Sequence, residues 1–280
     1  MITGLDHVVV LLRDLDAGAK AYELLLGRAP SWRSASDGAE TVLFTLDNMT
    51  LELMAPAGHS PTAERICNVI KIWGEGLASI CFRVGDIEKT WRRLDRVALK
   101  PEPVAEVEGR DTGSGRILRW KRTRVATELT RDVRVFFLEL AEERPRSAVT
   151  DAAPVLALDH VVVSTEDPER AAALYGARLG LDMALDRSHR DLGQLMFFRC
   201  GDLIVEVVKR PVAGADQRHD KLWGLSWRVA DIAATRARLS AAGIDVSEVR
   251  AGRRPGTRVV SVRDGTCGIH TLLLERTATA

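Results

Sequence analysis

The hexapeptide Leu-Asp-His-Val-Val-Val occurs at residues 5–10 and again at residues 158–163. The agreement continues beyond each copy without a gap, since Tyr22 falls on Tyr175 under the same offset. A fixed offset between similar stretches indicates a structural unit that is used more than once. The hexapeptide therefore predicts an internal duplication.

A second, fainter repeat lies between and after these copies. Arg-Val-Gly-Asp-Ile at residues 83–87 matches Arg-Val-Ala-Asp-Ile at residues 228–232. The chain then consists of four units in the order A, B, A, B. A solenoid is not expected, because the units exceed fifty residues and form two unlike pairs.

The first unit has an interpretable order of elements. A β-branched run at residues 6–10 is followed by Asp14, an N-cap residue type, and by an alanine- and leucine-rich stretch that ends at Gly27. Three further strand patterns follow before Pro56. The unit is therefore βαβββ, and the other three units repeat this order. A helix at residues 61–73 is expected to join the first two units, and residues 142–154 resemble a linker.

Bulk composition excludes several classes of protein. The 280 residues are 46% hydrophobic and 28% charged, with a net charge of +1, which is typical of a globular protein and attracts no nucleic acid. No apolar run is long enough to span a membrane, and the start of the chain does not resemble a signal peptide. We therefore expect a cytoplasmic protein that binds neither nucleic acid nor membrane. The four cysteines are scattered singly and suggest no zinc or redox motif.

Glutamate recurs in the last strand of three units. Glu52, Glu139 and Glu206 each stand between apolar neighbours, and by this alignment the fourth unit has Leu273 instead. One interpretation is a sheet whose second face meets solvent. The other is a ligand site, because the first strands of two of these units also carry His7 and His160, and histidine with glutamate on facing strands is metal-binding chemistry.

These motifs together resemble the vicinal oxygen chelate superfamily, which includes glyoxalase I, bleomycin resistance proteins and extradiol dioxygenases. The resemblance covers nearly the whole chain. It implies an α+β fold of four βαβββ units paired into two cupped, mixed-sheet, barrel-like domains. We therefore expect a first domain at 1–143, with units 1–56 and 76–143. A second domain is expected at 155–280, with units 155–210 and 221–276.

The resemblance also implies a metal site with one ligand from the first strand and one from the last strand of each unit. The residues at those positions are His7, Glu52, Ser79 and Glu139 in the first domain, and His160, Glu206, Gly224 and Leu273 in the second. The first domain then has the fuller ligand set, with Ser79 as its departure from the family pattern. The expected cofactor is a divalent ion, Mn, Fe, Ni, Mg or Zn.

The implied activity is that of a glyoxalase-type isomerase or lyase acting on a small substrate with vicinal oxygens. Glu139 or Glu52 would move the proton next to the carbonyl. The second domain would shape the pocket or support a homodimer. Ring-cleaving dioxygenases place two histidines and a glutamate at positions that match His160, Gly224 and Leu273, so that activity is disfavoured here.

Three alternatives stay open at the level of sequence. A drug-sequestering binding protein would use the same cup without a metal, and a pure scaffold would fill its cups with side chains. The units could also pair in a crossed order, in which the inner units assemble Glu139, His160 and Glu206 with Ser79.

Overall fold

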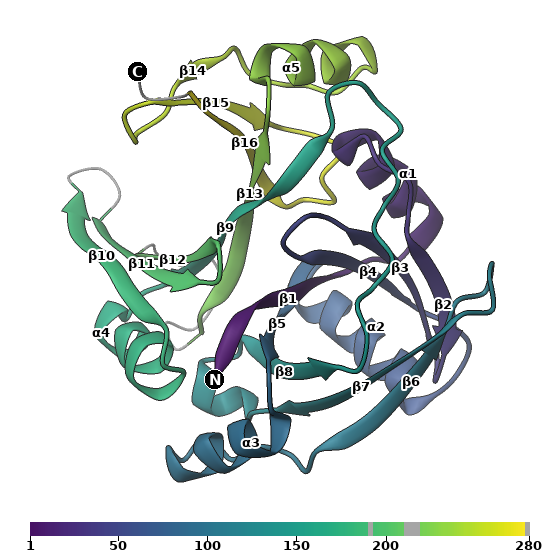
Figure 1. Cartoon of the computed structure of the whole chain (residues 1–280), viewed down its shortest axis with the longest axis vertical. Helices are drawn as coiled ribbons and strands as arrows, with labels where there is room; N and C mark the ends of the chain where they lie inside the picture. Colours follow the sequence, from purple (N-terminus) through teal and green to yellow (C-terminus); the bar gives the residue numbers. More distant parts are fainter. Residues whose placement is uncertain (190–192, 210–218, 278–280) are drawn as a thin grey trace.

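The computed structural model describes residues 1–189, 193–209 and 219–277. Position 210, assigned above to the third unit, and positions 278–280, assigned to the second domain, lie outside these residues. The strands form two eight-stranded sheets in the orders β2-β3-β4-β1-β5-β8-β7-β6 and β10-β11-β12-β9-β13-β16-β15-β14 (Figure 1). The predicted α+β fold with two cupped sheets is confirmed, whereas the domain boundaries stay predictions.

The first sheet and its helices follow the βαβββ order twice. Their bounds are β1 Ile2–Leu11, α1 Leu15–Leu26, β2 Trp32–Ser36, β3 Ala39–Thr45, β4 Thr50–Pro56, α2 Pro61–Trp73, β5 Gly76–Val84, α3 Ile87–Arg96, β6 Ala105–Arg110, β7 Ile117–Arg124, a 3-10 turn Thr127–Thr130 and β8 Arg134–Leu140. Local chemistry explains the limits of α1, because the Asp14 side chain accepts a hydrogen bond from the backbone N–H of Ala17 and Gly27 ends the helix with a φ of 63°.

The second sheet repeats the order with a shorter first helix. Its elements are β9 Val155–Thr165, α4 Pro168–Ala172 continued by a π-helical turn Ala173–Arg178, β10 Asp182–His189, β11 Gly193–Cys200, β12 Leu203–Lys209, β13 Lys221–Val229, α5 Ile232–Ala241, β14 Arg250–Ala251, β15 Thr257–Val262 and β16 His270–Arg276. No helix in the described part of the chain is both long and apolar enough to cross a membrane.

Units that are consecutive in sequence share a sheet. Strand β1 pairs with β5, and β9 pairs with β13, in both cases antiparallel. The crossed pairing of the inner units is therefore wrong. Glu139 and His160 belong to different sheets, so they cannot join in one cup.

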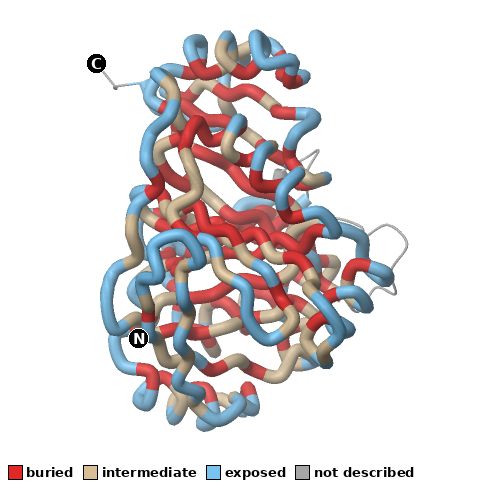
Figure 2. Tube along the Cα trace, turned by 90° about the vertical axis from the view of Figure 1, so that its right-hand side faces the viewer, coloured by how far each residue is buried: buried red, intermediate tan, exposed pale blue. Residues whose placement is uncertain are grey.

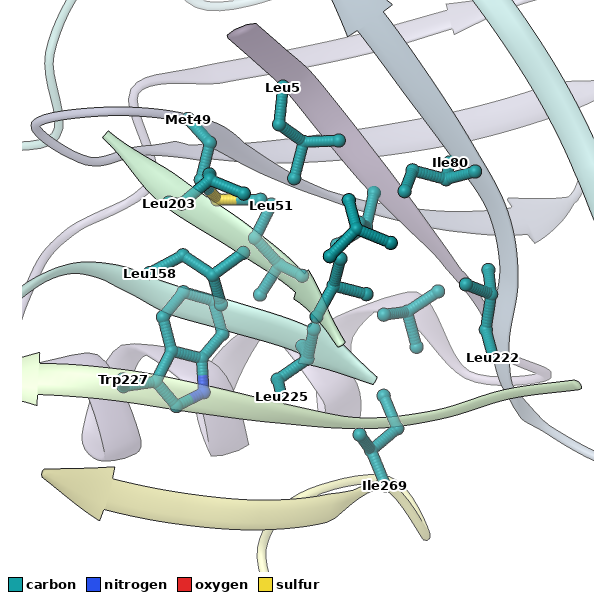
Figure 3. Packing of buried hydrophobic residues seen from close by; sticks show 14 of the residues in the cluster. Leu5, Met49, Leu51, Ile80, Leu158, Leu203, Leu222, Leu225, Trp227 and Ile269 are labelled. Carbon is teal, nitrogen blue, oxygen red and sulfur yellow. The ribbon is translucent and has the colours of Figure 1, made fainter. Parts of the chain in front are cut away.

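Each sheet has one face against the apolar core and one concave face. Figure 3 shows Leu5, Leu51 and Ile80 of the first sheet packed in the same cluster as Leu158 and Trp227 of the second. The tube in Figure 2 shows buried segments running through the centre of the molecule. Because successive side chains of a strand alternate between faces, the residues between these core positions point into the two cups, away from the shared core.

The first sheet curls until its edge strands meet. The backbone N–H of Arg33 in β2 donates to Oδ1 of Asp111 at 2.9 Å, and that of Thr112 donates to the carbonyl of Arg33 at 2.8 Å, which joins β2 to the turn after β6. Helix α2 packs Ile66 and Ile70 on the concave face, where they contact a cluster that includes Val9. In the second sheet, β10–β12 and β14–β16 splay apart (Figure 1).

Arginines fasten the two halves of the chain to each other. Arg238 in α5 donates to the carbonyls of Leu24 and Leu25 at the end of α1, at 2.5 and 3.0 Å. Arg178 donates to the carbonyl of Ala98, just after α3, at 2.7 Å. Helix C-terminal carbonyls lack partners within their own helix and favour cations, so these contacts fix the relative position of the two sheets.

Candidate functional site

The concave face of each sheet carries one histidine beside one glutamate. In the first sheet, Nε2 of His7 lies 3.4 Å from Oε2 of Glu52, and the two side chains are 12% and 17% exposed. In the second, Nε2 of His160 lies 3.1 Å from Oε2 of Glu206, with side-chain exposures of 19% and 11%. The structure thus brings together the predicted ligands within each A-type unit.

A carboxylate on the other ring nitrogen completes each row. Nδ1 of His7 lies 2.7 Å from Oδ1 of Asp6, and Nδ1 of His160 lies 3.1 Å from Oδ2 of Asp159. A bulge allows neighbours in sequence to meet in this way, because the register of β1 shifts between Leu5 and the histidine that follows. Sequence reasoning missed both aspartates, although each directly precedes the repeated histidine.

Asp6 is a fully buried carboxylate held by cations. Its partners, besides His7, are Nε of Arg83 at 3.2 Å and Nη1 of Arg144 at 2.5 Å. Burial alone would raise the pKa of Asp6, but the hydrogen bond from His7 and the charge of Arg144 outweigh it and hold the pKa well below its usual range. The ionised carboxylate only accepts hydrogen bonds, so Nδ1 of His7 carries a hydrogen.

The environment of His7 favours its charged form. Burial lowers the pKa of His7, but Cys81, Asp6 and Glu52 together raise it above the ordinary value. Burial also raises the pKa of the Cys81 thiol, against the opposing effect of His7. An imidazolium between two carboxylates is a charge-compensated arrangement for a buried site.

The second row repeats the aspartate–histidine–glutamate arrangement, with one more exposed arginine at its aspartate. Burial raises the pKa of Asp159, yet the hydrogen bond and charge of His160 and the nearby Arg276 lower it to about 2. Nη2 of Arg276 lies 2.6 Å from Asp159, and the Arg276 side chain is 49% exposed. In contrast, the Arg144 side chain at the first site is 8% exposed.

Glu139 does not join the first row. Its Oε2 accepts a hydrogen bond of 2.6 Å from the backbone N–H of Ile87 at the start of α3, on the core side of β8. In β8, the residue that pairs with Cys81 of β5 is Phe136. Phe136 therefore takes the position that Glu52 takes in β4, where it pairs with Val9 of β1. We therefore assign Glu139 the role of a helix-terminal acceptor and not that of a ligand or base.

The fourth unit requires a similar correction. Leu273 is fully buried in the core cluster, and the cup position that faces Ser226 across β13 and β16 is Leu272. Glu275 repeats the contact of Glu139, since its Oε2 accepts a 2.8 Å hydrogen bond from the N–H of Ile232. The predicted asymmetry between a fuller first site and a poorer second site therefore disappears.

The remaining positions of each cup supply few metal donors. In β5, Ser79 pairs with Val9, and in β13, Gly224 pairs with Val162. A metal site would form near these positions, beside the glutamate of each cup. Among the described residues, the group of potential donors whose atoms lie within 4.8 Å of one another is Asp6, His7 and Cys81. Asp6 already accepts from two arginines, and the raised pKa of Cys81 disfavours the thiolate that would bind a metal. His7 and Glu52 are therefore the residues of this cup that could hold a cation.

Comparisons with known proteins agree with this architecture. A family model described as a glyoxalase-like domain matches residues 5–180, which is more than half of the chain. The chain belongs to the glyoxalase-like domain family. A model described as the glyoxalase, bleomycin resistance protein and dioxygenase superfamily matches residues 159–260 of this glyoxalase-like protein, so the resemblance inferred from the repeats is confirmed. No curated protein matches the chain.

Solved structures show the same fold at low identity. A mutant of 4-hydroxymandelate synthase from Streptomyces coelicolor has a TM-score of 0.71 at 14% identity, with 100% of this chain and 94% of that chain covered. The Mn(II)-bound glyoxalase from Novosphingobium aromaticivorans has a TM-score of 0.64 at 13% identity, covering 98% and 82%. A catechol 2,3-dioxygenase has a TM-score of 0.64 at 14% identity, covering 100% and 90%. At these identities the likeness establishes the fold of the glyoxalase-like protein and not its reaction.

Proposed function

We propose that this protein is a glyoxalase-type isomerase or lyase that acts on a small substrate with vicinal oxygens, using a divalent cation at each histidine–glutamate pair. The observation that carries the proposal is the Asp–His–Glu row, which is built twice with the same atoms in contact. A histidine whose Nδ1 is held by a carboxylate presents Nε2 in a fixed direction, which is the usual arrangement behind a metal-binding imidazole.

The donors fit a cation site with open positions. His7 and Glu52 would hold the ion in the first cup, and His160 with Glu206 would do so in the second. Catalytic sites commonly have three protein ligands and keep a position for water or substrate. Since Ser79, Phe136, Gly224 and Leu272 add no strong donor, substrate oxygens and water would fill the remaining positions. A bound divalent cation would supply Lewis acidity toward those oxygens.

The residues of the chain have separate roles in this scheme. Glu52 is the base that takes the proton from the carbon next to the carbonyl, since its carboxylate is partly exposed to the cup. Asp6 is a positioning residue, because it is buried and its side chain is engaged by His7 and two arginines. Helix α2 and the closed edge of the first sheet limit water around the base. Glu206 and Asp159 repeat these roles in the second cup.

Metal uptake tests the proposal. Titration calorimetry with Mn²⁺, Fe²⁺, Ni²⁺ and Zn²⁺ is expected to give about two equivalents of at least one ion, because each cup has one histidine–glutamate pair. His7→Ala should remove one equivalent and His160→Ala the other, while Glu139→Ala, the matched control, should remove none. Failure of the parent protein to take up any of these ions would contradict the metal-dependent function.

A third donor should strengthen the first site. Ser79 faces the first cup beside Val9, so Ser79→His is expected to tighten binding of Zn²⁺ or Mn²⁺ by about tenfold or more, the equivalent of ~1.4 kcal/mol. Gly224→His is the contrasting variant, because a Cβ there would lie 2.7 Å from the carbonyl oxygen of His270 and would displace backbone. Equal gains at both positions, or no gain at Ser79, would refute this placement of the site.

Binding without catalysis is the second candidate function. It is favoured by the imidazolium of His7, whose charge Asp6 and Glu52 compensate without a metal. A binding protein would hold a polar ligand at this pair and would take up no ion in the titration above, so the same experiment separates the two functions.

A further inference from the structure

A pocket separate from both histidine–glutamate pairs lies where the ends of the two sheets meet. Its volume is about 340 Å³, within the range of small-molecule sites. Residues of both halves line it, from the ends of β1 and α2 and the starts of β5, β8, β13 and β16. We call it the inter-sheet pocket. None of the four proposed cation ligands is among its lining residues.

Aromatic rings form part of the pocket wall. Trp73, at the end of α2, contacts the ring of His219 edge-on with centroids 5.6 Å apart, and its side chain is still 44% exposed. Trp223 stacks on His270 with centroids 4.0 Å apart and 19° between the planes. Flat aromatic surfaces of this kind favour a flat, apolar ligand body.

The acidic residues of the pocket already have partners. Oε1 of Glu75 accepts from the backbone N–H of Arg13, and Asp132 pairs with His219. Oδ1 of Asp220 accepts from Arg131 at 2.8 Å and from Thr165 at 2.7 Å. Oδ2 of Asp220 is buried without a hydrogen-bond partner among the described residues, but Arg131 balances the charge of this carboxylate. Because each of the three carboxylates is paired with a basic residue, they offer little net charge to a cationic ligand.

Two basic residues of the pocket are available. Within the described residues, neither Arg134 nor Lys221 has an ion pair or a side-chain hydrogen bond. Arg134 is partly buried, and burial together with the like charge of Arg124 lowers its pKa, although the opposite charge of Asp132 acts against this shift. Because Asp132 pairs with His219, Arg134 is a partly desolvated cation without an ion pair of its own in the described part of the chain, and such a cation gains from an anion.

Contacts between the two halves of the chain hold the part of the pocket wall that Asp132 and Asp220 form. The backbone N–H of Asp220 donates to the carbonyl of Arg131 at 2.7 Å, in addition to the side-chain bond between the two residues. Arg131 and Asp132 both have positive φ, 52° and 69°, which these contacts across the halves maintain. The pocket is therefore preformed, and a ligand need not order it.

We infer that the inter-sheet pocket binds a planar aromatic anion, such as an aromatic carboxylate, with its ring against Trp73 and Trp223 and its carboxylate at Arg134 and Lys221. A guanidinium and an ammonium that line the same pocket can recognise a carboxylate by charge-assisted hydrogen bonds. This site is independent of the proposed cation sites.

Calorimetry with three naphthalene derivatives tests the inference. Naphthoate is expected to bind at least about tenfold more tightly than neutral naphthamide or cationic naphthylmethylammonium, because only the anion pairs with the two bases. Arg134→Gln and Lys221→Gln should each weaken naphthoate binding by about tenfold, and Trp73→Leu should also weaken it. Arg92→Gln, at an exposed position of α3, is the matched control and should bind as the parent does.

Two further measurements keep the outcomes distinct. Glu52→Gln should leave naphthoate affinity unchanged, whereas a loss would place the anion in the first cup and overturn the inference. Thermal unfolding shows whether the Arg134→Gln variant is folded. Lys221 is exposed, so Lys221→Gln tests the contribution of a base to naphthoate binding with little risk of unfolding the protein. The inference fails if the parent does not bind naphthoate at ~1 mM, or if both glutamine variants bind it as the parent does.

Discussion

Replacing Asp6 with asparagine is expected to lower the free energy of unfolding by about 3–5 kcal/mol. The side chain is fully buried and contacts His7, Arg83 and Arg144, of which Arg144 is 8% exposed. Asparagine keeps the size but removes the charge, so buried cations lose their counter-charge. Urea denaturation of parent and variant measures the difference.

The second sheet provides the control for this prediction. Asp159→Asn removes the equivalent carboxylate, but Arg276 there is 49% exposed and can be hydrated by water. We therefore expect a loss of only about 1–2 kcal/mol for Asp159→Asn. Equal losses in the two variants would show that the burial of Arg144 is not what makes Asp6 important.

The same network predicts how stability depends on pH. The folded pKa of Asp6 is lowered, so its contribution is full above the unfolded value of about 3.9 and is lost as the pH falls through the folded pKa. The folded pKa of His7 is raised, so its contribution is full below about 6.5 and is lost as the pH rises through the folded pKa. Asp6→Asn should flatten the acid side of the profile in particular.

Replacing Glu52 with glutamine is expected to slow proton exchange on a substrate by at least about 100-fold. The amide has nearly the shape of the carboxylate but cannot accept a proton, and it also weakens the cation site. NMR measures this step as the incorporation of solvent deuterium into dihydroxyacetone, at the carbon next to its carbonyl. The protein is loaded with Zn²⁺ and kept free of Mn²⁺. This compound has vicinal oxygens.

Glu139→Gln is the matched control for that experiment. Its carboxylate accepts a hydrogen bond from the N–H of Ile87 and lies on the other face of its sheet, so exchange should stay near the parent rate. Glu206→Gln tests the second cup in the same way. If the loss followed Glu139→Gln while Glu52→Gln exchanged normally, the assignment of the base would be refuted.

Much of the fold follows from the sequence, because repeats and alternation are local signals. The helix expected at 61–73 has the limits of α2. The repeated hexapeptide marks one of the two central strands of each sheet, and each copy carries the histidine of its cup. The edge strand β10 was not predicted, since its alternation is weak and Met183 and Leu185 are exposed.

The site was predicted only in part, for a reason of strand phase. In β8, both faces are apolar, because Val135 and Phe137 face the core while Phe136 and Leu138 lie on the opposite face. Alternation therefore gave no indication of which face Glu139 occupies. Its contact with a helix N-terminus depends on the position of α3, which is tertiary information. In β4, a mixed pattern around Glu52 did fix the face.

The arginine contacts between the halves have a consequence for movement. Many two-lobed enzymes admit and enclose their substrates by rotating one lobe about a hinge. Here Arg238 holds the end of α1 and Arg178 holds the end of α3, each from the opposite half. Rigid-body closure would break these contacts and open the shared core. Access to either cup must therefore come from side chains and loops at its own rim, and each cup can open while the other stays shut.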